Sequence, residues 1–121
     1  MRTNRPHKNL LAWQKSVDLV TEVYKMTNGF PRDQQFVLSA QTQRAAISVP
    51  SNIAEGMAKR SSKDRTRFLE IAQGSLSELD TQVEVAMRLR FVDESEYTLL
   101  MDLMEEIQRL LSGLIRTYSE R

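Results

Sequence analysis

Residue types that commonly carry chemistry are scarce in this 121-residue chain. It contains no cysteine, which excludes disulfides, thiol nucleophiles and zinc–thiolate sites and agrees with a reducing cytoplasm. His7 is the single histidine, so a di-metal centre built from Glu-x-x-His pairs on two helices is excluded. No glycine-rich phosphate loop or nucleophile elbow occurs. The sequence therefore predicts that the protein is not an enzyme and has no catalytic residues, metal or cofactor.

Long apolar runs are also missing. No segment approaches the roughly 18 apolar residues of a membrane span, and the charged start of the chain lacks the apolar region of a secretory signal. We therefore expect a cytoplasmic protein with no membrane partner. Only three prolines and four glycines interrupt the chain, and apolar residues make up 40% of it, as in ordinary globular domains. We expect one domain over residues 1–121, with residues 1–8 forming a mobile arm.

What the chain does contain is apolar residues at helical spacing. A first helix is predicted from Leu10 and ends at the Asn28-Gly29-Phe30-Pro31 corner, where proline cannot continue it. Its main apolar stripe is spaced 3-4-3-4, and a second set flanks that stripe. The stripe consists of Leu10, Trp13, Val17, Val20 and Tyr24, and the flanking residues are Leu19, Val23 and Met26.

A second helix is predicted from about Gln34 to Met57, with Asp33 as its N-cap. Pro50 lies in its middle. A proline inside a helix removes one backbone hydrogen bond and costs roughly 3 kcal/mol. Because small and apolar residues keep helical spacing on both sides, we predict a kink near Pro50; division into two helices is the alternative.

Two further helices are predicted from N-terminal capping residues and regular apolar stripes. Ser61 with Asp64 forms one capping box, with Ser62 as the alternative cap, and Asp93 with Glu96 forms the other. Four long helices with short connections predict an all-α, antiparallel, up-down-up-down four-helix bundle. The expected core stripes are Leu69, Ala72, Leu76, Leu79, Val83 and Ala86, followed by Tyr97, Leu100, Met104, Ile107, Leu111, Leu114 and Tyr118.

Polar residues form a row on one side of the second predicted helix. Arg44, Ser48, Asn52 and Glu55 are spaced 4-4-3 among alanines, and small or polar residues within 71–79 offer a matching strip. This pattern indicates close helix–helix contact through a structural polar network of Arg44, Ser48, Asn52, Glu55 and Glu78. A buried or half-buried Arg44–Glu78 pair is one candidate contact, which would contribute more to register than to stability. A ligand site is the alternative.

A basic corner, defined as residues 57–67, follows this helix. Its five cations face one acid, Asp64, so its local charge is +4. Such clusters attract phosphate backbones through counterion release. An ordinary solvated loop is the alternative interpretation, since one neighbouring aromatic, Phe68, is no stacking platform. The candidate nucleic-acid-binding residues are Lys59, Arg60, Lys63, Arg65 and Arg67.

Charge is divided between the halves of the chain although the total is +1. Residues 1–60 carry nine Lys/Arg against four Asp/Glu, whereas residues 61–121 carry eight against twelve. Several predicted helices also carry two adjacent apolar stripes, more than one core needs, which predicts self-association. The acidic half of one subunit could therefore meet the basic half of its neighbour.

Several motifs resemble a known family, the four-helix-bundle proteins encoded in intervening sequences of bacterial 23S rRNA genes. The resemblance covers about 10–114, and its most specific part is Q-x-x-R-A-A-x-S-V-P-S-N-I-A-E-G from Gln41. The other residues that carry it are Trp13-Gln14, Phe30-Pro31, Arg60, Phe68-Leu69, Ile71-Ala72, Gly74-Ser75-Leu76 and Glu78.

The resemblance implies a ring-like homopentamer with no established enzymatic activity. It also implies similarity to the accessory protein of diversity-generating retroelements, a basic pentamer that binds nucleic acid and a reverse transcriptase. This chain departs from that protein because its net charge is near zero. We therefore expect an oligomeric binding protein whose partner is RNA or DNA at the basic corner. A protein–protein adaptor that binds another protein and no nucleic acid is the alternative.

Overall fold

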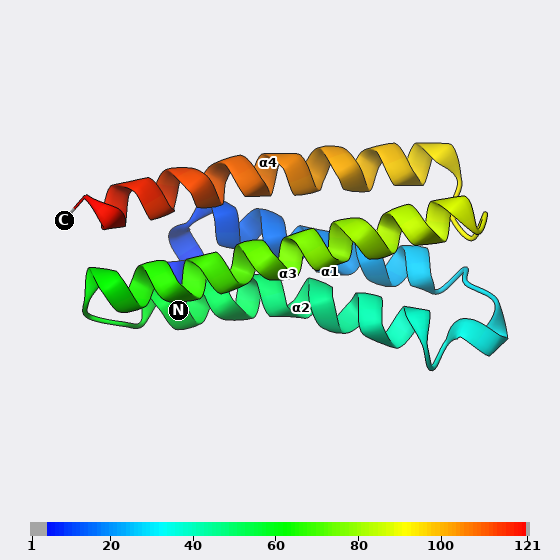
Figure 1. Cartoon of the computed structure of the whole chain (residues 1–121), viewed down its shortest axis with the longest axis horizontal. Coiled ribbons are helices and arrows are strands. Elements are labelled where there is room, and N and C mark those ends of the chain that lie inside the picture. Colours follow the sequence, from blue (N-terminus) through cyan, green and yellow to red (C-terminus); the bar gives the residue numbers. More distant parts are fainter. Residues whose placement is uncertain (1–4, 121) are drawn as a thin grey trace.

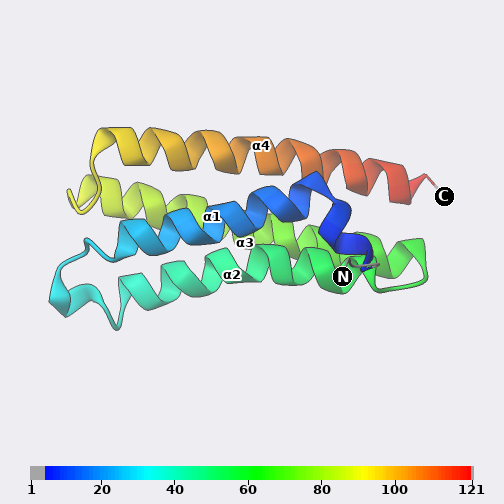
Figure 2. The same ribbon diagram turned by 180° about the vertical axis from the view of Figure 1, so that it is seen from behind.

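The structure, a computed structural model, describes residues 5–120 and is built of helices alone over that range. Its four long helices run alternately up and down, side by side, in the order α1–α2–α3–α4 around the bundle (Figures 1 and 2). The all-α antiparallel four-helix bundle is thus confirmed. The elements are η1 (Pro6–Asn9), α1 (Leu11–Thr27), η2 (Arg32–Gln34), α2 (Leu38–Met57), α3 (Ser62–Arg88) and α4 (Glu94–Ser119).

Side-chain caps begin the two longest helices, as predicted. Ser61 Oγ accepts a hydrogen bond from the backbone N–H of Asp64 at 3.1 Å, and Asp93 Oδ1 accepts one from Glu96 at 2.8 Å. The bond from the Glu96 N–H lowers the pKa of the Asp93 carboxyl, because it stabilises the carboxylate. Each cap satisfies a backbone donor that the first helical turn leaves unpaired.

Helix α2 runs through Pro50 without a break, so Pro50 does not end the helix and division into two helices is wrong. The kink at Pro50 stays a prediction. The predicted start of α2 is wrong. The helix begins at Leu38, and Asp33 lies in η2 instead of capping α2. The reason is tertiary: the Gln35 amide donates to the carbonyl oxygens of Phe30 and Thr27, at 3.0 and 3.4 Å. These bonds hold 32–37 in a turn that folds back on the end of α1.

The core matches the prediction in α3 and is displaced by part of a turn in α1. Every residue of the predicted α3 stripe is buried, as are Leu100, Met104, Ile107 and Leu111 of α4. In α1, however, the predicted main stripe lies at the margin: Trp13, Val17 and Val20 are half-buried, and Tyr24 is exposed. The face that packs inward includes two small residues, which allow close approach of the other helices. It consists of Ala12, Ser16, Leu19, Val23, Met26 and Thr27.

The N-terminal segment was expected to be a mobile arm, and residues 1–4 of that arm lie outside the described residues. Residues 6–9 form η1, which packs beside the start of α1. The His7 ring meets the edge of Trp13 at a centroid distance of 5.1 Å, and Gln14 donates to the carbonyl of Lys8. Within residues 5–120, no helix has the length and apolar character needed to cross a membrane.

Candidate nucleic-acid interface

The basic corner lies at the end of the bundle that also holds the C-terminal end of α4 (Figure 1). Gly56 brings α2 and α3 together there. A Cβ at Gly56 would lie 3.1 Å from both the Arg65 carbonyl oxygen and the Phe68 Cβ. The last turn of α2 therefore packs directly on the first turns of α3, and the Ser61 cap fixes where α3 begins.

Two of the five candidate cations are engaged within the chain. Arg65 is half-buried, donates from Nε to the Lys59 carbonyl at 2.8 Å, and places its guanidinium 5.2 Å from the Tyr118 ring centroid. Lys59 Nζ lies 3.2 Å from a Glu55 carboxylate oxygen and 5.3 Å from the Phe68 ring centroid. Arg65 links the corner to α4, whereas Lys59 pairs with an acid of α2 and packs against α3, so both cations already have partners within the chain.

The other three candidates, Arg60, Lys63 and Arg67, are exposed. Within residues 5–120, none of them has a carboxylate within 4.0 Å. Arg67 also lies over Phe68, at 4.5 Å from the ring centroid. Cations that are exposed and have no acidic partner keep their attraction for anions, so these three residues are the strongest candidates for phosphate contacts at the corner.

A shallow hollow of about 490 Å³ lies beside the corner, between the start of α3 and the end of α4. Lys63 and Arg67 line it one helical turn apart, and the positive end of the α3 dipole adds to their attraction for an anion. Glu70 lies one turn further and limits the positive surface. The remaining lining residues are Ser62, Thr66, Tyr118 and Ser119.

The candidate polar network joins α2 and α3 only at its centre. The Ser48 and Ser75 hydroxyl oxygens are 2.7 Å apart, and the Asn52 amide donates to Ser48 Oγ at 2.9 Å. Glu55 instead pairs with Lys59 along its own helix. The polar side chains at this helix contact therefore form hydrogen bonds with one another. This favours the structural interpretation of the network over a ligand site.

The predicted buried Arg44–Glu78 pair is not formed. Both residues are exposed, and no ion pair within 4.0 Å joins them. They line an open hollow of about 370 Å³ between α2 and α3, and Glu78 accepts from the Gln82 amide at 3.4 Å. At this position the two side chains project toward solvent, where hydration competes with pairing.

One hydrogen bond between α3 and α4 was not predicted from the sequence. The Tyr97 hydroxyl donates to Glu84 Oε1 at 2.6 Å, which lowers the pKa of the Glu84 carboxyl and raises that of Tyr97. Arg88 Nε also donates to Glu84, at 3.0 Å. Only the Glu84–Arg88 spacing of four could have indicated part of this cluster. Among residues 5–120 no group of three His, Asp or Glu side chains is arranged to hold a metal ion.

Comparison with known proteins gives a family and a fold. The family model described as 23S rRNA-intervening sequence protein matches residues 8–113. The structure is similar to a crystal structure of a protein of unknown function from the S23 ribosomal protein family of Bacteroides thetaiotaomicron. That similarity has a TM-score of 0.81 at 24% sequence identity and covers 88% of this chain and 96% of that one. Among curated proteins, none matches this chain.

Proposed function

The chain belongs to the 23S rRNA-intervening sequence protein family, and from this premise we propose that it is a non-enzymatic, oligomeric protein that binds RNA or other nucleic acid. The binding surface is the basic corner. The observation that supports this is the group of exposed cations without acidic partners, Arg60, Lys63 and Arg67, on a corner made rigid by the Ser61 cap and the Gly56 contact. Phosphate contacts of this kind give affinity with slight sequence preference.

Each copy offers only a few phosphate contacts, so the proposal includes self-association. A homo-oligomer, expected to be a pentamer, repeats the corner around one assembly. Several weak sites on one body can engage a single folded RNA and gain avidity without any new contact. A cytoplasmic location, where such an RNA is accessible, completes the proposal.

The test is filter binding to a structured RNA at low and high salt, comparing the parent with Arg60→Gln/Lys63→Gln/Arg67→Gln. For each phosphate that a cation neutralises, the logarithm of the affinity falls by about 0.7–0.9 per decade of salt. The triple variant should therefore bind more weakly and with a smaller salt slope. The matched control is Lys25→Gln/Arg32→Gln/Arg88→Gln, which removes the same charge at the opposite end of the bundle and should bind as the parent does.

Two results would reject nucleic-acid binding at the corner. One is a parent protein that does not bind at low salt, and the other is equal binding by the triple variant and the parent.

The adaptor function would then be favoured, with the chain acting as a scaffold for another protein. One observation already favours it as the second candidate: Phe36 and Val37 are exposed at 93% and 57%, and apolar side chains this open are typical of protein interfaces.

A further inference from the structure

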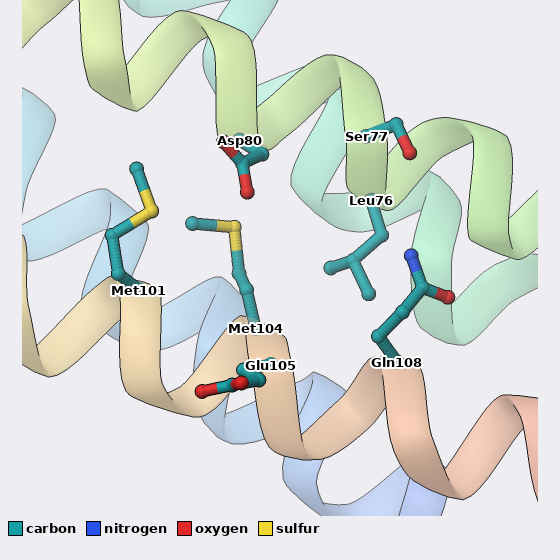
Figure 3. A pocket seen from close by; sticks show the side chains of 7 residues that line it. All are labelled: Leu76, Ser77, Asp80, Met101, Met104, Glu105 and Gln108. Atoms are coloured by element: carbon teal, nitrogen blue, oxygen red, sulfur yellow. The ribbon is translucent and has the colours of Figure 1, made fainter.

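A hollow of about 570 Å³ opens between α3 and α4, away from the basic corner. Figure 3 shows Asp80 and Leu76 extending from α3 toward Met104 of α4, with Met101 and Gln108 on either side. Leu76 and Met104 are buried and form an apolar floor, whereas Asp80 and Glu105 are exposed at the rim. The lining of this α3–α4 hollow is completed by Ser77.

The acids of the rim are available to a partner. Among residues 5–120, no cation lies within 4.0 Å of the Asp80 carboxylate. Glu105 approaches Arg109 at 3.7 Å, but both side chains are about 70% exposed (71% and 69%), and such pairs contribute little. At the end of the hollow, Gln108 Oε1 accepts no hydrogen bond within residues 5–120, but it is shielded from solvent and therefore closed to an incoming donor.

Methionine side chains make the apolar lining of the α3–α4 hollow adjustable in shape. Met101 and Met104 are unbranched and polarizable, so they adjust to apolar groups of different shape, and methionine is common on surfaces that accept varied helices. An adjustable apolar floor between carboxylates matches the two faces of a basic amphipathic helix. The apolar face of that helix packs on the thioethers while its lysines or arginines reach the rim.

The charge of the surrounding surface points to the same class of partner. Residues 68–121, which follow the basic corner, carry eleven Asp/Glu and five Lys/Arg, a net charge of −6. A surface of this sign repels phosphate, so the α3–α4 hollow is unsuited to nucleic acid or to anionic lipid. Residues 68–121 therefore supply none of the cations proposed to bind nucleic acid.

We propose that the α3–α4 hollow is a docking site for a basic amphipathic helix of a partner protein. The apolar anchors of that helix contact Met101 and Met104, and its cations pair with Asp80 and Glu105. The site shares no residue with the basic corner, which lies at the start of α3, and is further along α3 and α4. One copy can therefore hold a nucleic acid and a protein partner at once.

The test uses a synthetic amphipathic peptide of about 15 residues, with leucines on one helical face and lysines on the other. It should bind the full chain at low salt and more weakly at high salt. Replacing Asp80→Asn and Glu105→Gln together should weaken binding about tenfold, the expected scale for two partly solvated charge pairs. The matched control, Asp18→Asn/Glu78→Gln, removes the same charge from outside the hollow and should change the affinity little. A peptide with glutamates in place of lysines should not bind.

Methyl NMR of methionine-labelled protein locates the bound peptide. The Met101 and Met104 methyl signals should shift on titration, while those of Met26 and Met57, buried elsewhere in the core, stay in place. Equal affinity of the Asp80/Glu105 variant and its control would overturn the proposal, as would unmoved Met101 and Met104 signals. It would also be overturned if these two signals shifted with protein concentration alone, because a second copy of the chain would then fill the hollow. None of these readouts depends on RNA binding.

Discussion

At the scale of single residues, Tyr97 and Glu84 carry a pH-dependent contribution to stability. The Tyr97 hydroxyl lowers the pKa of Glu84, so the folded state favours the carboxylate more than the unfolded state does. This contribution is present above the unfolded pKa of Glu84 and is lost as the pH falls through the lowered folded value. In urea unfolding at neutral pH, Tyr97→Phe should therefore be less stable than the parent. The difference should shrink in acid, and the Glu84 pKa measured by NMR should rise.

The control at this scale is Tyr24→Phe. Tyr24 is exposed, and its hydroxyl makes no hydrogen bond within residues 5–120, so its removal should leave the pH profile unchanged. A Tyr97→Phe difference that is the same at acid and neutral pH would show that the effect does not depend on the charge of the Glu84 carboxylate.

At the scale of the helices, two glycines should respond to alanine in opposite directions. A Cβ at Gly56 would lie 3.1 Å from the Arg65 backbone and the Phe68 Cβ, so Gly56→Ala must push α3 away from α2 and should destabilise the bundle by about 1–3 kcal/mol. Gly74 lies inside α3, is exposed, and has nothing within 4 Å of an added Cβ. Gly74→Ala should stabilise by roughly 0.5–1 kcal/mol, because alanine has the higher helix propensity. Thermal unfolding of both variants measures the contrast, and a stabilised Gly56→Ala would contradict the close contact.

At the scale of the whole molecule, the apolar surface between α1 and α2 predicts self-association. The Gln43 amide donates to Thr27 Oγ1 at 2.9 Å, so Tyr24 and Ile47, one turn from each, lie on the same side of the helix pair. They are 42% and 43% exposed, and the half-buried Val17 and Val20 adjoin Tyr24 on α1. Light scattering at micromolar concentration should report a mass well above the 14.0 kDa of one chain. Tyr24→Lys/Ile47→Lys should lower it while circular dichroism stays helical; a monomeric parent would contradict the prediction.

The residues also show where sequence reasoning succeeds and where it fails. The bundle, both capped helix starts and the α3 core were predictable, because a helical period and a cap are set by neighbours within a few residues. Which cations of the basic corner have partners within the chain, and which are exposed, was not predictable. Arg65 is engaged because the Lys59 carbonyl and the end of α4 come near it, and no local pattern contains that information. The Lys59–Glu55 pair, by contrast, follows from a spacing of four along the chain.

What the amino-acid sequence determined by itself was therefore the number of helices, their approximate lengths, the Ser61 and Asp93 caps, and the continuation of α2 through Pro50. Tertiary structure decided which of two adjacent stripes of α1 is buried and where α2 begins. It also decided that Arg44 and Glu78 stay apart and that methionines and acids of α3 and α4 enclose a hollow. The reason is physical: these features depend on the rotation and offset of one helix against another. Side chains distant in the chain set that packing jointly.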